Sequence, residues 1–384
     1  MRILMLNHNV AHSGGTFFRA YHFGREMARR GHEVTLLTIS PRRRFGFKRE
    51  MDAGVQLIET PDWLWGRGRT GWDMWDTLRR LSYVRGGRWD VVHAFDSRPV
   101  VIFPALSLRR HGIPLILDWA DWWGRGGTIT ERPTGAAVRF LFGPIETYLE
   151  ETFRTRAHGT TVISSALRER AISLGVCDKS IALIPQGSDV EKVKPLAKDE
   201  CRRALGLPLK AAIVAYIGVL NNSDAELLFS TFEHLLKMRP RCRLLLIGNH
   251  KTRVPEIPGI LETGFLSHEK YLEHLGASDL CLLPLKDTIS SRGRWPSKIN
   301  DYLAAGRPIV ASAVGDIRQL FEQHLIGQAT TDNPESLAEA ANALLSDESL
   351  LEVMGQNARR VAENELNWSI LGEQLEAHYL AMLR

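Results

Sequence analysis

The segment at residues 290–312 combines cations, a carboxylate and helix-boundary residues in an order that suits a doubly charged anion. Three cations stand close together in it: Arg292, Arg294 and Lys298. Pro296 and Ser297 are typical of a helix start, and Gly306 is typical of the residue after a helix end. A helix N-terminus has free N–H groups and favours negative charge, so cations gathered there suit a diphosphate. A capped surface helix with solvated charges is the alternative.

Asp301 adds a second kind of binding group to this segment. It lies three residues after Lys298, on the same expected helix face and about one turn further along. Its carboxylate could accept hydrogen bonds from two ribose hydroxyls. The segment therefore predicts a nucleoside diphosphate site, with Ser297 at the helix start.

A second candidate phosphate site follows the first expected strand. Gly14 and Gly15 precede a helical pattern at Phe17–Arg30, and glycine backbone N–H groups can approach a phosphate closely. The spacing is not GxGxxG and no acidic residue follows the second expected strand, so no dinucleotide site is expected. A plain turn is the alternative. His8 and His12 lie on this loop and could reach a ligand.

Two parallel sheets are expected to position these segments. Continuous β-rich apolar runs alternate with longer amphipathic ones, as strands buried on both faces do. The first series of expected strands is Arg2–Leu6, Glu33–Ile39, Gln56–Ile58, Val91–Ala94, Pro114–Leu117, Gly159–Ile163 and Ile181–Ile184. The second series is Ala211–Ile217, Arg243–Ile247, Ile260–Leu261, Leu280–Leu283, Pro308–Ala311 and Gly327–Ala329. Ligands bind at the carboxyl ends of such strands.

The length of 384 residues suits two domains. We place an N-terminal Rossmann-like domain at residues 1–192 and a C-terminal one at 193–365, divided by a polar linker with Pro195. Met354–Arg384 forms a long amphipathic pattern with no strand after it, and its last part, about 366–384, is expected to return to the first domain. The fold class is α/β, with a cleft between the domains as the default ligand site.

Charge and tryptophan are concentrated in the first half of the chain. The net charge is +5, but residues 1–190 carry 27 Lys and Arg against 19 Asp and Glu. Eight of the ten tryptophans precede residue 124 and are interleaved with arginines. Indoles and guanidinium groups suit a bilayer interface, so we expect peripheral contact with an anionic membrane and no nucleic acid partner. A tryptophan core with solvated arginines is the alternative.

Several classes of protein are excluded. The four cysteines are far apart with no CxxC pair, which argues against a disulfide framework or a zinc site. No apolar stretch is long enough for a membrane span, and the N-terminus turns polar too early for a signal peptide. We therefore expect a cytoplasmic protein. The sequence contains no Asp-x-Asp motif, so no metal ligands are expected.

Six segments in this order resemble the retaining family 4 ("group 1") glycosyltransferases of GT-B architecture. They are SGGTFFRAYHFGREMARRGHEVTLLT near the start, WDVVHAF at 89–95, VISSALRERAISLG with IALIPQGSD within 162–189, LLLIGNH at 244–250, ETGFLSHEKYLEHLGASDLCLLPL at 262–285 and PSKINDYLAAGRPIVAS at 296–312. The resemblance covers Met1 to about residue 370. It implies two Rossmann-like domains facing across a cleft, with a nucleotide sugar on the second and an acceptor on the first.

This sequence differs from the family's pattern at several positions that bind the donor. The family's two glutamates, seven residues apart, fall on Gly293 and Asp301, so the second keeps a carboxylate for ribose and the first is missing. Asp287 is a candidate for the donor sugar's hydroxyls only by its proximity in the sequence. The family's diphosphate-gripping Arg and Lys fall on Val219 and about Ser223, so the cations of 292–298 would supply that charge. Further donor-binding residues implied are Gly218, Gly264, Phe265 and Leu266.

In the first domain the resemblance points to two carboxylates. In LILDWADWW the family's His-Asp pair falls on Ala120 and Asp121, and Asp96 stands where members often have an acid facing the acceptor. Both follow expected strands, so either could orient or deprotonate an acceptor hydroxyl. A loop cap, or pairing with Arg98 or Arg125, is the alternative for each.

The function expected is transfer of a sugar from a UDP- or GDP-sugar to a hydroxyl of a glycan or glycolipid. The family resemblance implies retention of configuration, and cations would stabilise the leaving diphosphate without metal or cofactor. Polysaccharide assembly at the inner face of the plasma membrane is the expected setting. Two alternatives stay open: a catalytically degenerate sugar-nucleotide-binding scaffold, and a sugar-nucleotide epimerase or hydrolase.

Overall fold

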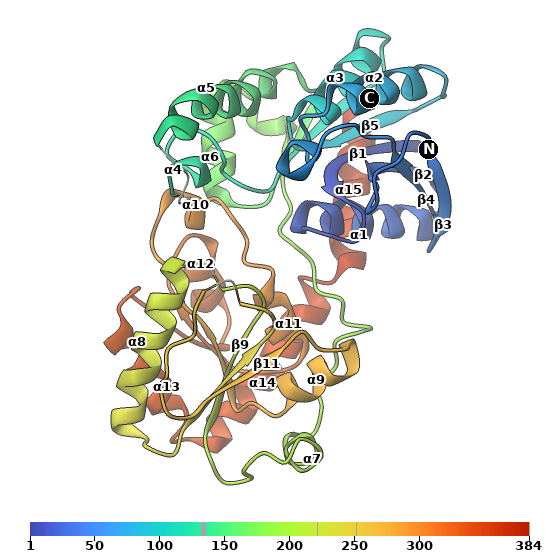
Figure 1. Ribbon diagram of the computed structural model, residues 1–384. Helices are drawn as coiled ribbons and strands as arrows, with labels where there is room; N and C mark the ends of the chain where they lie inside the picture. The colour runs from blue at the N-terminus through green and yellow to red at the C-terminus, as the bar shows by residue number, and fades with distance from the viewer. Residues whose placement is uncertain (132–135, 221, 251, 384) are drawn as a thin grey trace. The chain divides into compact units, whose positions relative to one another are not determined.

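The computed structural model describes residues 1–131, 136–220, 222–250 and 252–383. The chain forms two compact units (Figure 1), one of Met1–Gln186 with Trp368–Arg384 and the other of Gly187–Asn367. The first unit therefore ends at Gln186, a few residues before the sequence-based boundary at 192. The linker with Pro195 leads into a short helix, α7 (Lys198–Ala204), in the second unit.

The first unit is built on an eight-stranded sheet in the order β3-β4-β2-β1-β5-β6-β7-β8. Its strands are β1 (Arg2–Val10), β2 (Glu33–Ile39), β3 (Lys48–Asp52), β4 (Val55–Thr60), β5 (Val91–Phe95), β6 (Leu115–Trp119), β7 (Gly159–Val162) and β8 (Ile181–Leu183). All pairs are parallel except β3 with β4, so the expectation of a purely parallel sheet is wrong at this edge. The β3 sequence is KREMD and is mostly exposed, which is why no apolar run marked it.

Helices cover both faces of this sheet with separate apolar cores. The helices of the first unit are α1 (Gly15–Arg29), η1 (Gly66–Arg69), α2 (Met74–Arg85), α3 (Pro99–Arg110), α4 (Thr128–Glu131), α5 (Ala136–Thr152), η2 (Arg154–Arg156), α6 (Ser165–Ser173), η3 (Asp178–Ser180) and α15 (Trp368–Met382). One core lies under α1 and α15, and the other lies under α2, α3 and α5. Figure 1 shows α1 and α15 beside β1 and β2.

The C-terminal helical pattern is interrupted, although the sequence suggested one continuous run. It divides into α14 (Glu348–Asn364) in the second unit and α15 in the first. On α15, the Trp368 ring packs edge-on against Phe23 at 5.1 Å between centroids. The Tyr379 hydroxyl lies 2.6 Å from His93 Nδ1 on β5, inside the sheet's core. These contacts anchor α15 to the N-terminal sheet.

The second unit has a six-stranded, wholly parallel sheet in the order β11-β10-β9-β12-β13-β14. Its strands are β9 (Ile213–Ile217), β10 (Arg243–Ile247), β11 (Ile260–Gly264), β12 (Leu280–Leu283), β13 (Ile309–Ser312) and β14 (Gly327–Thr330). The remaining helices are α8 (Asn222–Met238), α9 (His268–Gly276), α10 (Ile289–Arg292), α11 (Lys298–Ala304), α12 (Asp316–Gln323) and α13 (Pro334–Leu344). Every strand expected in this half is present.

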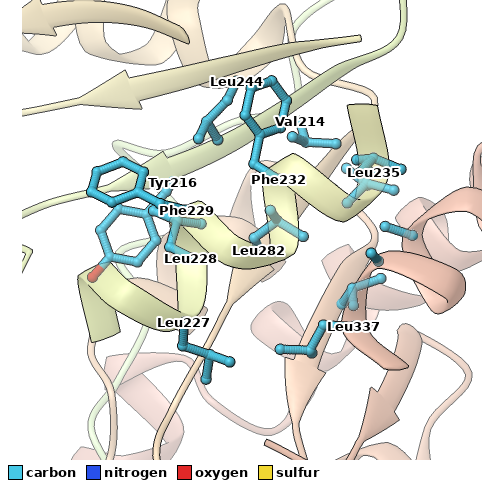
Figure 2. Close-up of a cluster of buried hydrophobic side chains, with 14 of the residues drawn as sticks. Val214, Tyr216, Leu227, Leu228, Phe229, Phe232, Leu235, Leu244, Leu282 and Leu337 are labelled. Atoms are coloured by element: carbon cyan, nitrogen blue, oxygen red, sulfur yellow. The ribbon is translucent and has the colours of Figure 1, made fainter. Parts of the chain in front are cut away.

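Figure 2 shows the main core of the second unit, where apolar side chains of α8 pack on strands of the sheet and on α13. Phe229 and Phe232 of α8 are buried against Val214 and Leu244. The Tyr216 ring lies at one side of this cluster, and its hydroxyl points away from the other labelled side chains. This core fixes the position of β9, whose last residues lie at the carboxyl edge of the sheet. Among the described residues no helix is long and apolar enough to cross a bilayer.

Candidate functional site

Three glycines leave bare backbone at the carboxyl edge of the second sheet. Gly218, Gly248 and Gly264 follow or end β9, β10 and β11, with φ of 87°, 126° and 65°. A Cβ on Gly248 would lie 3.2–3.3 Å from backbone atoms of Gly218, so these two loops touch through main chain alone. Bare backbone of this kind lets a ligand's phosphate or base edge approach N–H and C=O groups directly.

Lys298 lies at the same edge, at the first residue of α11. Its ammonium donates to the Tyr216 hydroxyl and sits 3.8 Å from the centre of the Tyr216 ring. Burial lowers the pKa of Lys298 to about 7, an effect that Asp224 opposes and Arg294 reinforces. The site therefore holds a cation that a bound anion would strongly favour.

Arg294 is the second cation of this cluster, and Arg292 is not part of it. The Arg294 guanidinium lies 3.4 Å from the buried carboxylate of Asp224, in the first turn of α8. Arg292 instead pairs with Asp287 at 2.6 Å, and its side chain is more than half exposed. The expected convergence of three cations is thus reduced to two, because Arg292 pairs with the exposed carboxylate of Asp287, five residues earlier in the chain. Asp287, the candidate for the donor sugar's hydroxyls, forms its ion pair with Arg292.

Asp301 takes a different set of neighbours from Lys298. The Tyr271 hydroxyl of α9 donates to Asp301 Oδ2 at 2.6 Å. Burial raises the pKa of Asp301 to about 6, although the Tyr271 hydrogen bond and the charge of His268 act in the opposite direction. A carboxylate with one oxygen held in this way is oriented and keeps acceptor capacity on its other oxygen.

The remaining residues expected at this site differ in exposure. Ser297 precedes α11 but makes no side-chain capping hydrogen bond to the helix. Phe265 is 89% exposed after β11, and Leu266 is half-buried. Tyr216, Asp224 and Tyr271 were not anticipated as part of this site. The position of Tyr216 near the end of the first strand of this half was the one clue in the sequence.

In the first unit, the two expected catalytic carboxylates line one pocket. Asp96 follows β5 and Asp121 follows β6, and these strands are neighbours in the sheet. Among the other lining residues are Thr16, Arg98, Asp118, Ala120, Glu146 and Arg154. The sequence did not indicate Glu146 or Arg154, because they come from α5 and η2, far along the chain. The pocket is small, and its guanidinium groups are bound within the protein: Arg98 pairs with Asp96 and Glu146, and Arg154 donates to the carbonyl of Asp118.

Asp96 is held in a strained conformation. Its φ is 94°, a region that non-glycine residues rarely adopt and that is common at functional sites. Its Oδ2 lies 3.3 Å from His8 Nδ1 and 3.9 Å from Arg98 Nε, and its Oδ1 accepts the Ser97 N–H. Burial alone would raise the pKa of Asp96, but His8, Arg98 and Ser97 together hold it below its usual value. Burial lowers the pKa of His8 to about 4, so its imidazole is neutral.

The glycine pair after β1 forms the start of α1. Gly14 has a φ of 86° and is the N-cap residue of the helix, whereas Gly15 has open space around its Cα. A Cβ on Gly14 would lie 2.5 Å from Asn9 Nδ2, which could move, so it is the positive φ that favours glycine here. The next residue, Thr16, lines the pocket that contains Asp96.

Two family models cover most of the chain. Residues 14–187 match the glycosyl transferase 4-like domain, and residues 211–347 match the glycosyl transferases group 1 domain. The chain belongs to the family 4, or group 1, glycosyltransferases. Each match falls within one of the two units apart from a single residue, so the glycosyltransferase has the two-domain GT-B architecture expected from its sequence.

Relatives of this glycosyltransferase are distant. The alpha-D-kanosaminyltransferase of Streptomyces kanamyceticus is 24% identical over 92% of this chain and 96% of that protein. A D-inositol 3-phosphate glycosyltransferase of Corynebacterium urealyticum is 25% identical over 53% of this chain and 51% of that protein. Other curated relatives also match over about half of their length.

Solved structures of the same fold match over nearly the whole chain. Sucrose-phosphate synthase from Thermosynechococcus elongatus superposes with a TM-score of 0.78 at 18% identity, covering 100% of this chain and 99% of that one. HepE of Anabaena, in complex with UDP and glucose, gives 0.72 at 16% identity over 99% and 100%. At these identities the likeness establishes the GT-B fold.

Proposed function

We propose that this glycosyltransferase transfers a sugar, with retention of configuration and without a metal ion or cofactor, from a nucleoside diphosphate sugar to a hydroxyl. The donor is of the UDP or GDP type, and the acceptor is a glycan or a lipid-linked glycan in surface polysaccharide assembly at the inner face of the plasma membrane. The observation that carries the proposal is the half-buried Lys298 beside Arg294 at the glycine-rich edge of the second sheet.

The donor's diphosphate would be bound by Lys298 and Arg294, with N–H groups near Gly218 and Gly248 supplying further donors. As the bond to the sugar breaks, negative charge grows on the diphosphate, and fixed cations in a buried site stabilise that charge strongly. At neutral pH Lys298 is only partly protonated, and the bound anion would favour its protonated form. The Asp301 carboxylate, oriented by Tyr271, would accept the ribose hydroxyls.

The acceptor would be bound in the pocket of the first unit. Asp96 is ionised at neutral pH, where Arg98 and the Ser97 N–H favour its charged form and His8 is neutral. An ionised carboxylate can accept the hydrogen bond of the attacking hydroxyl and orient it. Asp121, in the same pocket, is the second candidate for this task.

Names and titles of related proteins support this proposal. The HepE structure holds UDP and glucose, and the kanosaminyltransferase is named for transfer of a sugar. The absence of an Asp-x-Asp motif from the sequence supports a mechanism without a metal ion.

The direct test is transfer of labelled sugar from a panel of UDP- and GDP-sugars to lipid-extracted and soluble glycan acceptors, with and without EDTA. We expect a labelled product with one nucleotide type, unchanged by EDTA, with the anomeric configuration of the donor by NMR. Inversion of configuration, or activity that EDTA abolishes, contradicts the mechanism.

A catalytically degenerate nucleotide-binding scaffold is the second candidate. Two observations favour it: Val219 stands exposed where the family carries a cation, and Asp224 places a negative charge beside the two remaining cations. Tight nucleotide binding with no transfer to any acceptor and no hydrolysis of the donor would support the scaffold. Donor breakdown or isomerisation without any acceptor would instead support a hydrolase or epimerase.

A further inference from the structure

Seven large apolar side chains are exposed in the loop before β3, the loop after β4 and the start of α2, and we call this surface the Trp face. They are Phe45, Trp63, Leu64, Trp65, Met74, Trp75 and Leu78. Trp65 is 77% exposed and Trp63 is 62% exposed, so these indoles are not part of a core. The alternative interpretation, in which the tryptophans fill the core, holds for Trp119 but not for these two.

Ring contacts join part of the Trp face. The rings of Trp63 and Trp75 meet edge-to-face at 6.2 Å. The Arg79 guanidinium lies over Trp75 at 5.7 Å, and that of Arg43 lies over Trp65 at 4.1 Å. The two loops that carry these residues are joined by main-chain hydrogen bonding, because the Asp62 N–H donates to the Arg44 carbonyl.

A single buried carboxylate fixes the position of the exposed indoles. Asp73 caps the N-terminus of α2 and accepts hydrogen bonds from the Trp75 and Asp76 N–H groups. Its other oxygen accepts the N–H groups of Trp63 and Leu64. The tryptophans are therefore presented by an ordered turn, so little conformational entropy is lost if they bind a surface.

The outward charge of the Trp face is positive. Residues 41–85 contain ten Lys and Arg against six Asp and Glu. Four of these six acids are buried: Glu59, Asp62, Asp73 and Asp76. Arg42 and Arg43 stay at the surface beside the indoles, as does Arg79.

The segment between Trp65 and Met74, which is part of the chain that carries the Trp face, is hydrogen-bonded to a residue of the candidate acceptor pocket. Arg98 donates to the Thr70 carbonyl at 2.8 Å, and Thr70 lies between Trp65 and Met74 in the chain. The same guanidinium pairs with Glu146 of α5 at 3.5 Å. Arg98 and Glu146 both line the pocket that contains Asp96.

We propose that the Trp face docks this protein on the anionic surface of a lipid bilayer. The indoles would enter the interfacial region, where an apolar body and a polar N–H are both accommodated, and the guanidinium groups would pair with lipid phosphates. This inference rests on the proposed function, in which a lipid-linked acceptor reaches the pocket from the membrane. It assigns the docking surface to residues 42–79.

The test is flotation of the full chain with vesicles of phosphatidylcholine alone or mixed with phosphatidylglycerol. We expect binding to the mixed vesicles, release in high salt, and little binding to neutral ones. Arg43→Gln with Arg79→Gln should lower the partition coefficient about fivefold for each cation. Trp63→Ser with Trp65→Ser should remove most of the remaining binding. Leu209→Ser, at an exposed apolar residue of the second unit, should leave binding unchanged.

Three results would overturn the proposal. One is equal binding to neutral and anionic vesicles. Another is unchanged binding of the arginine variant, which removes two charges and their contacts with Trp65 and Trp75. The third is loss of binding in Phe140→Ser with Ile145→Ser, because this would assign the lipid contact to the exposed face of α5. Calorimetry with UDP and GDP needs no vesicle, so a failure here leaves the donor site independently testable.

Discussion

Replacement of Lys298 by methionine is the sharpest test of the donor site. Methionine keeps the aliphatic contact with the Tyr216 ring and removes the charge. A charge-assisted hydrogen bond contributes about 1.5–3 kcal/mol, so the loss of Lys298 should weaken nucleoside diphosphate binding about 10- to 150-fold at pH 6.5, where the lysine is mostly protonated. Isothermal calorimetry with UDP and GDP measures this ratio.

The lowered pKa adds a second part to the same prediction. The free site holds Lys298 with a pKa of about 7, so at pH 8 about nine in ten molecules carry it neutral. Binding an anion at pH 8 must then include proton uptake, which costs about 1.4 kcal/mol. The affinity ratio between wild type and Lys298→Met should therefore shrink about tenfold from pH 6.5 to pH 8.

The matched control is Arg292→Met. This arginine is only six residues away, but it is exposed and paired with Asp287, so its loss should change affinity by no more than about threefold. If Lys298→Met binds UDP and GDP as the wild type does at pH 6.5, or if Arg292→Met is the more damaging change, the assignment of the diphosphate to Lys298 is refuted.

Three further predictions follow from the site geometry. Nucleotide affinity should be greatest between about pH 6 and 7, because Asp301, with its pKa raised to about 6, gains a proton below this range and Lys298 loses one above it; calorimetry across pH checks this. Asp96→Asn should lower kcat by about 10²–10⁴ with little change in donor affinity, since its carboxylate is assigned to the acceptor hydroxyl; unchanged kcat in the transfer assay would contradict this. Gly248→Ala should destabilise the fold by about 1–3 kcal/mol in urea unfolding, because its φ of 126° and its contact with the next loop exclude a Cβ, whereas Gly15→Ala, in open space, should not.

Much of the fold could be predicted from the sequence because parallel strands buried on both faces have continuous apolar sequences. Glu33–Ile39, Arg243–Ile247 and Leu280–Leu283 begin and end as expected. The exposed edge strand β3 carries a polar sequence and gave no such pattern. The return of the C-terminal helix was expected, but its separation from α14 was not, because both segments are amphipathic at the same period.

The candidate donor site was only partly predictable. The helix at Lys298–Ala304 followed from the proline, serine and glycine that flank it. The convergence of three cations did not hold, because neighbours in a sequence need not share a partner in space. Arg292 pairs with Asp287, which is close in the sequence, whereas Arg294 pairs with Asp224, 70 residues earlier in the chain.

The sequence by itself determined the two βαβ series, the helix start at Lys298 and the carboxylates that follow the strands, because hydrophobic periodicity and helix-boundary residues act locally. Only the tertiary structure decided the environment of each side chain. Lys298 is half-buried and contacts Tyr216, 82 residues away, and Asp96 contacts His8 from another strand. Burial and long-range charge set the pKa and orientation of these groups, and both depend on which distant segments the sheets bring together.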